Sequence, residues 1–144
     1  MKLALGSDHA GFDLKVEIKS YLEELGHEVV DYGPGSAERC DYPDFAHPVA
    51  NAVENKEVEL GILMCGSGNG INMAANKHQG IRSALCWQKD IAELARQHND
   101  ANICALPARY LEVDKAKEIV HAFLAESFEG GRHADRVAKI PMNH

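Results

Sequence analysis

The sequence lacks three features that would each point to a different class of protein. No apolar run approaches the roughly 20 residues that span a membrane, and the opening Met1–Gly6 segment turns polar too early for a secretory signal peptide. Acidic residues number 22 against 15 lysines and arginines, for a net charge of −7, which argues against a nucleic-acid-binding surface. The four cysteines form no C-x-x-C pair, so neither a zinc site nor a disulfide framework is expected. We therefore expect a cytoplasmic protein that binds neither membranes nor nucleic acid.

Short apolar segments and amphipathic segments alternate along the 144 residues. The expected strands cover residues 3–5, 28–31, 61–64, 81–86 and 102–106, and the expected helices cover 12–25, 44–55, 71–77, 91–97 and 113–128. Regular alternation of this kind predicts a parallel sheet with helices on both faces. The prediction is a single α/β domain over residues 1–144, with a Rossmann-like, doubly wound, five-stranded parallel sheet.

The loop after the third strand carries the densest chemistry in the chain. An apolar run ends at Cys65, and a helix is expected to begin shortly afterwards. The residues in between are Gly66, Ser67, Gly68, Asn69 and Gly70. A strand, a glycine-rich turn and a helix N-terminus form an anion site, because glycines let backbone N–H groups point inward. These dipoles would favour the thiolate form of Cys65, so the loop predicts a base or nucleophile, a hydroxyl and oxyanion donors.

Familiar motifs do not fit this loop. A cysteine-dependent phosphatase needs C-x5-R, but Ile71 stands where the arginine would be. The glycines are too close for a Walker A loop and run G-x-G-x-G, which also fails the dinucleotide pattern. A tight turn with a buried, inert cysteine remains an alternative.

Polar residues also follow the first and fifth strands. Asp8 and His9 come after the first, and Arg109 comes after the fifth, so parallel topology places them at the same sheet edge as Cys65. Asp8 could instead cap the following helix. His98 and Asn99 precede the fifth strand and belong to the opposite edge. They could reach the site only from another subunit or through an unusual loop.

The charged tail contains Arg132 and Arg136, four residues apart. One helical turn would put both on one side, which suits bidentate binding of a phosphate. The alternative is a solvated tail without a ligand role.

Six motifs in order give the chain a resemblance to a known family. They are residues 6–12 (GSDHAGF), Asp41-Tyr42-Pro43, Cys65 to Gly70, Ala74 with Asn76-Lys77, residues 96–100 (RQHND) and residues 129–133 (EGGRH). From Lys2 to about Val137 the chain resembles ribose-5-phosphate isomerase type B, in the group that includes the galactose-6-phosphate isomerase subunits. Ser67 replaces a threonine found in many relatives, which keeps the hydroxyl.

The resemblance implies a role for each residue. Cys65 would be the base that moves a proton between C1 and C2, Ser67 and the loop would stabilise the enediolate, and His98 would open the sugar ring. The implied substrate-binding residues are Asp8, His9, Tyr42, Gly66, Gly68, Asn69, Gly70, Asn99, Arg109, Arg132 and Arg136.

The implied assembly is a homodimer that shares its active sites, or a dimer of such dimers. Residues 129–144 would contribute to phosphate binding or dimer contacts, and no metal or cofactor is expected. The expected reaction interconverts ribose 5-phosphate and ribulose 5-phosphate. Isomerisation of an aldohexose 6-phosphate, such as allose or galactose 6-phosphate, and a non-catalytic phosphosugar-binding module remain alternatives.

Overall fold

Five parallel strands form the centre of the protein. The computed structural model describes residues 1–142 and pairs the strands in the order β2-β1-β3-β5-β4. The strands are β1 (Lys2–Ser7), β2 (Glu28–Asp31), β3 (Leu60–Cys65), β4 (Ser83–Leu85) and β5 (Ile103–Pro107). All neighbouring pairs are parallel, so the predicted five-stranded parallel sheet is confirmed.

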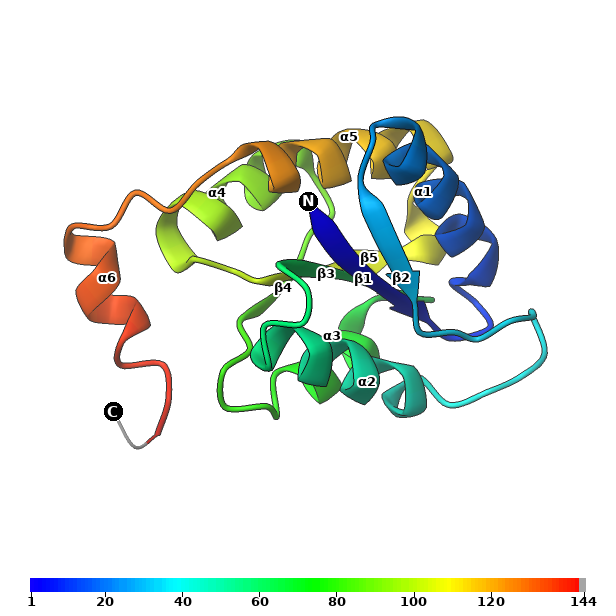
Figure 1. Ribbon diagram of the computed structural model, residues 1–144, viewed down its shortest axis with the longest axis horizontal. Helices are drawn as coiled ribbons and strands as arrows, with labels where there is room; N and C mark the ends of the chain where they lie inside the picture. The colour runs from blue at the N-terminus through cyan, green and yellow to red at the C-terminus, as the bar shows by residue number, and fades with distance from the viewer. Residues whose placement is uncertain (143–144) are drawn as a thin grey trace.

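Helices cover both faces of this sheet (Figure 1). They are α1 (Phe12–Glu24), α2 (Pro43–Glu54), α3 (Asn69–Ala75), α4 (Lys89–Asn99), α5 (Val113–Ala125) and α6 (Arg132–Val137), with a 3-10 turn η1 at Ala108–Tyr110. One layer contains α1, α4 and α5, and the other contains α2 and α3 (Figure 1). The short α6 lies beyond α4, at one end of the molecule (Figure 1). Within the described residues no helix is long and apolar enough to cross a membrane.

Two apolar cores result from the alternation of side chains along the central strands. Leu5 and Ile62 face the layer of α1, α4 and α5, where Phe123 is fully buried. Ala4 and Leu63 face the layer of α2 and α3. Burial of a leucine or phenylalanine side chain contributes roughly 1.5–3 kcal/mol, so these near-continuous apolar strands require cover on both sides.

Several predicted boundaries were wrong, and three of them are instructive. The expected strand 81–86 shortens to β4, because Ile81 closes a turn with its amide donating to the His78 carbonyl (3.0 Å). The expected helix 113–128 ends at Ala125, where the chain becomes extended at Glu126. The expected helix 71–77 begins two residues early, at Asn69, directly after the left-handed Gly68.

Lys15 is a buried cation that ties α1 to the end of β2. Its side chain is 1% exposed, and its Nζ donates to Asp31 Oδ1 at 2.7 Å and to the Pro34 carbonyl at 2.6 Å. The same Asp31 oxygen accepts the Gly33 amide at 2.8 Å. These contacts fix the loop that leaves β2 against α1.

We expect Asp31→Ala to lower the free energy of unfolding by about 3–5 kcal/mol, because it leaves the buried Lys15 ammonium without its counter-charge. Lys15→Met keeps most of the volume and removes the charge, so it should cost much less. Combining both substitutions should recover most of the loss. Urea unfolding of the three variants measures this, and equal losses for the two single variants would contradict it.

Candidate active site

The loops after β1, β3 and β5 meet at the carboxyl edge of the sheet, as predicted. The Asp8 amide donates to the Met64 carbonyl at 3.3 Å, and the Arg109 amide donates to the Gly66 carbonyl at 3.0 Å. The Arg109 side chain also packs against Gly66, because a Cβ on Gly66 would lie 3.1 Å from a terminal guanidinium nitrogen of Arg109. One cationic side chain therefore lies directly over the glycine loop.

The glycine loop is shaped by close contacts at Gly68 and Gly70. Gly68 has φ +77°, and a Cβ there would meet Leu85 Cδ1 at 2.5 Å. At Gly70 a Cβ would lie 2.6 Å from Tyr42 Cζ, so the Tyr42 ring packs on the Gly70 backbone. The Asn69 amide donates to Ser67 Oγ at 3.3 Å and orients that hydroxyl.

Cys65 is the last residue of β3 and forms the floor of this loop. The residue is 5% exposed, and it belongs to the apolar core beside α2 and α3. Cys40 and Cys104 are poor candidates for a thiolate. Burial raises the pKa of the Cys40 thiol, and a hydrogen bond with Cys86, together with burial, raises the pKa of the Cys104 thiol well above its ordinary value.

Asp8 and His9 are fixed by backbone contacts. Asp8 Oδ1 accepts the Gly11 amide at 3.0 Å in the turn before α1, but Gly11 itself is the N-cap of this helix and no side chain caps it, so the capping alternative for Asp8 is wrong. The Cys40 amide donates to His9 Nδ1 at 3.2 Å. His9 Nδ1 also lies 3.2 Å from the Cys40 carbonyl oxygen, so both backbone polar groups of Cys40 hold the ring in place.

The second set of predicted residues lies elsewhere in the chain. His98 and Asn99 end α4, which runs back toward the amino edge of the sheet, and α6 carries Arg132 and Arg136 beyond it (Figure 1). Within one chain, these four residues are not brought together with Cys65. The sequence predicted this separation, because His98 and Asn99 precede a parallel strand whereas Cys65 ends one.

His98 has two neighbours to which the sequence assigned no role. Its ring stacks on that of His133, with centroids 4.2 Å apart and planes 12° apart. Glu129 Oε1 lies 3.8 Å from Nε2 of both rings. No local spacing motif connects the three residues, so this cluster was missed.

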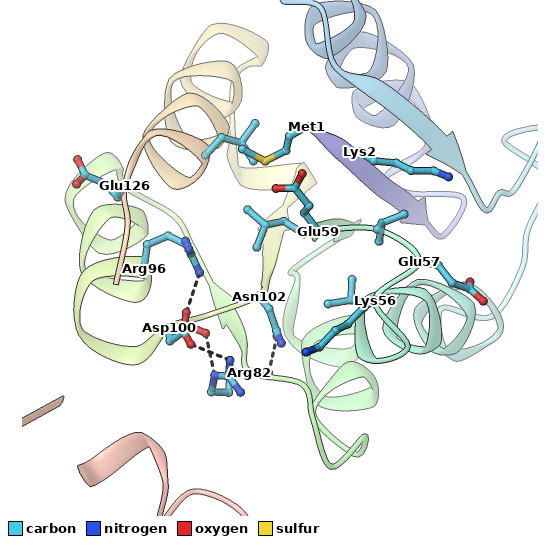
Figure 2. Close-up of a pocket in the computed structure, with 14 residues that line it drawn as sticks. Met1, Lys2, Lys56, Glu57, Glu59, Arg82, Arg96, Asp100, Asn102 and Glu126 are labelled. Carbon is cyan, nitrogen blue, oxygen red and sulfur yellow. Dashed lines mark hydrogen bonds and ion pairs between the residues drawn. The ribbon is translucent and has the colours of Figure 1, made fainter. Parts of the chain in front are cut away.

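A cavity of about 510 Å³ lies away from the predicted site. It opens at the amino ends of the strands, where Lys2, Glu59 and Asn102 line it (Figure 2). Arg82 and Arg96 both pair with Asp100 there, at 3.2 and 3.3 Å. None of the predicted catalytic or substrate-binding residues is among its lining residues in the described part of the chain. We therefore do not place the active site in this cavity.

A doubly wound sheet with a thiol, a glycine loop and an arginine at its carboxyl edge defines an α/β protein built to hold a small anionic ligand. The chain belongs to the Ribose/Galactose Isomerase family, whose family model matches residues 3–140.

Similar proteins cover nearly the whole chain. Ribose-5-phosphate isomerase B of Escherichia coli (strain K12) is 51% identical over 139 residues, which are 96% of this chain and 93% of the relative. The structure of Clostridium thermocellum ribose-5-phosphate isomerase B gives a TM-score of 0.96 at 50% identity, covering 97% of this chain and 95% of the other. The Mycoplasma genitalium ribose-5-phosphate isomerase B with bound ribulose-5-phosphate gives a TM-score of 0.92 at 44% identity, covering 96% and 93%.

We expect Gly68→Ala to lower the free energy of unfolding by about 2 kcal/mol or more and to reduce turnover. A left-handed alanine is strained and its methyl group would overpack against β5 and Leu85. Gly35→Ala is the matched control, because a Cβ there meets nothing within 4 Å. Thermal unfolding and kcat/KM check the pair, and a Gly68→Ala enzyme as stable as the control would contradict the geometry.

Proposed function

We propose that the protein is a ribose-5-phosphate isomerase of type B, which interconverts ribose 5-phosphate and ribulose 5-phosphate. The observation that supports this most strongly is Cys65 at the end of β3, followed at once by a glycine loop whose first residue, Gly66, contacts Arg109. Membership of the isomerase family supports the reaction class, and the relative with bound ribulose-5-phosphate supports a pentose phosphate as substrate.

Cys65 is the base that carries a proton between C1 and C2. The thiol is small, lies at the loop floor and is covered by residues that exclude bulk water. The backbone N–H groups of the loop and Ser67 Oγ receive the negative charge that develops on the enediolate oxygen. One well-placed donor of this kind contributes about 3 kcal/mol to transition-state stabilisation.

The residues around this loop bind the sugar. Tyr42 and Gly70 form one wall through their direct contact, and Arg109 forms another over Gly66. Asp8 and His9 approach from the end of β1, and the backbone of Cys40 holds the His9 ring in place. Gly68 and Asn69 complete the turn from which α3 begins.

His98, Asn99, Arg132 and Arg136 belong to the active site of a second subunit. The support is their distance in the fold from their own Cys65: α4 ends at the amino edge, whereas β3 ends at the carboxyl edge. A homodimer, or a dimer of such dimers, would place each α4–α6 end against a partner's glycine loop. His98 then opens the ring while Cys65 acts at carbon.

Arg132 and Arg136 hold the phosphate. Both lie in α6, so a separation of four residues puts them on one helix face. Charge-assisted hydrogen bonds to phosphate contribute about 1.5–3 kcal/mol each. The segment 129–144 is thereby proposed to serve phosphate binding or dimer contacts within a single domain of residues 1–144; residues 143–144 lie outside the described residues.

The reaction as proposed needs no metal and no cofactor, because base, oxyanion donors and phosphate anchor are all protein groups. A cytoplasmic location is supported by four free cysteines. An aldohexose 6-phosphate is the second candidate substrate, since the same chemistry serves a longer sugar. The distance between the glycine loop and the phosphate-binding arginines decides between pentose and hexose phosphates. A non-catalytic phosphosugar-binding module would leave Cys65 and His98 unused.

We expect Cys65→Ala to abolish isomerisation while keeping the fold and phosphosugar binding, because it removes only the proton carrier from a small, well-packed position. Cys40→Ala is the control, since that thiol lies outside the glycine loop. A coupled assay of ribose 5-phosphate, allose 6-phosphate and galactose 6-phosphate, with and without EDTA, measures activity and preference. Near-normal turnover by Cys65→Ala, or activity lost to EDTA and restored by zinc, would overturn the mechanism.

A further inference from the structure

Three potential metal ligands converge beside the end of α4. The ligand atoms of His98, Glu129 and His133 all lie within 4.8 Å of one another. Their side chains are 41%, 53% and 27% exposed, respectively, so an ion from solution can reach them. Two imidazoles and one carboxylate form a ligand set typical of Zn²⁺ and related divalent ions.

Backbone contacts fix this cluster in place. The Glu129 amide donates to the Gln97 carbonyl at 3.0 Å, next to His98 in sequence. Gln97 Nε2 also donates to Glu126 Oε2 at 2.7 Å, which ties the segment after α5 to α4. The chain then reverses through Gly130 and Gly131, whose φ angles are +71° and +59°. This reversal brings His133 back over His98.

The geometry lies close to that of a bound ion. Zinc–nitrogen bonds of about 2.0–2.1 Å place two ligand nitrogens roughly 3.0–3.4 Å apart at tetrahedral or octahedral angles. Glu129 Oε1 is already 3.8 Å from each Nε2. The stacked rings must tilt toward each other, a small movement for partly exposed side chains. Water or a substrate oxygen can fill the remaining positions.

Charge around the cluster fits a cation. Glu129 supplies the negative charge of the cluster, and a bound divalent ion would leave a net positive site beside Arg132 and Arg136. The carboxylate between two histidines is otherwise held only by weak, long contacts.

We propose that a divalent transition-metal ion of the zinc class binds to His98, Glu129 and His133 and inhibits the enzyme. The inhibition rests on the proposed function, because it arises from occupation of His98 Nε2, which would otherwise serve ring opening. Binding itself does not depend on that role. The ion is therefore a ligand of this chain and not a participant in the isomerisation.

Co²⁺ is the spectroscopic probe for binding, with Zn²⁺ as competitor. At pH 7.5 we expect one Co²⁺ per chain, seen in its visible absorption bands, and displacement by Zn²⁺. Glu129→Gln and His133→Gln should each weaken binding at least about 10-fold, because even outer-shell changes cost 10–100-fold in metal affinity.

Matched controls locate the ion. Asp135→Asn removes another carboxylate from α6, and His121→Gln removes a histidine from α5; both should bind normally. His78→Gln tests the second histidine pair, in which His47 Nδ1 lies 2.7 Å from His78 Nε2. An affinity changed by His78→Gln but not by Glu129→Gln would overturn the proposal, as would a strong cobalt–thiolate band or failure to bind one ion per chain.

Inhibition is read as the ratio of activity with and without Zn²⁺ for each variant. The parent and Asp135→Asn should lose most of their activity in Zn²⁺ and recover it in EDTA, whereas Glu129→Gln should resist at the same concentration. If the parent enzyme binds Co²⁺ but Zn²⁺ does not inhibit it, the proposed inhibition through His98 is refuted although the metal site exists. An inactive parent that binds Co²⁺ would count against the proposed function alone.

Discussion

Backbone hydrogen bonds between adjacent strand ends hold the glycine loop in the form on which the site depends. The Asp8 amide joins the end of β1 to Met64, and the Arg109 amide joins the turn after β5 to Gly66. Without these two bonds, three separate loops would have to find a common arrangement at an entropic cost of about 1–2 kcal/mol per fixed residue. Preorganised amide donors are also what an oxyanion site requires, because they need no rearrangement during the reaction.

The parallel sheet imposes a second constraint. Every strand ends at one edge, and every covering helix returns to the other, so α4 carries His98 away from Cys65. No local rearrangement of either loop bridges the length of an 11-residue helix. A chain that needs both residues in one site must therefore associate with a second copy, which makes assembly part of the proposed chemistry.

The sequence predicted the sheet and the glycine loop well, because both depend on local pattern. The apolar run up to Cys65 and the glycines after it determine a strand, a turn and a helix start without distant contacts. The predicted limits of β4 were wrong, since Ile81 has the apolar character of a strand residue but forms a turn with His78. The His98–Glu129–His133 cluster was not predicted, because residues 31 and 35 positions apart meet only through the turn at Gly130 and Gly131.

The packing of Tyr42 on Gly70 was also beyond local pattern. Tyr42 directly precedes α2, and Gly70 lies in α3, so only the packing of these two helices brings them into contact. The resemblance to a known family named Tyr42 as a substrate-binding residue, but it did not indicate which surface the ring would cover. Contacts of this kind depend on the completed core between α2, α3 and the sheet.

Subunit complementation tests whether two chains share each active site. Cys65→Ala and His98→Asn variants, each inactive or impaired alone, are mixed and allowed to exchange subunits. We expect recovery of about one quarter of the parent activity, because half of randomly paired dimers are mixed and each mixed dimer holds one intact site. Activity no greater than the average of the two separate variants, with exchange verified by mass labelling, would contradict it.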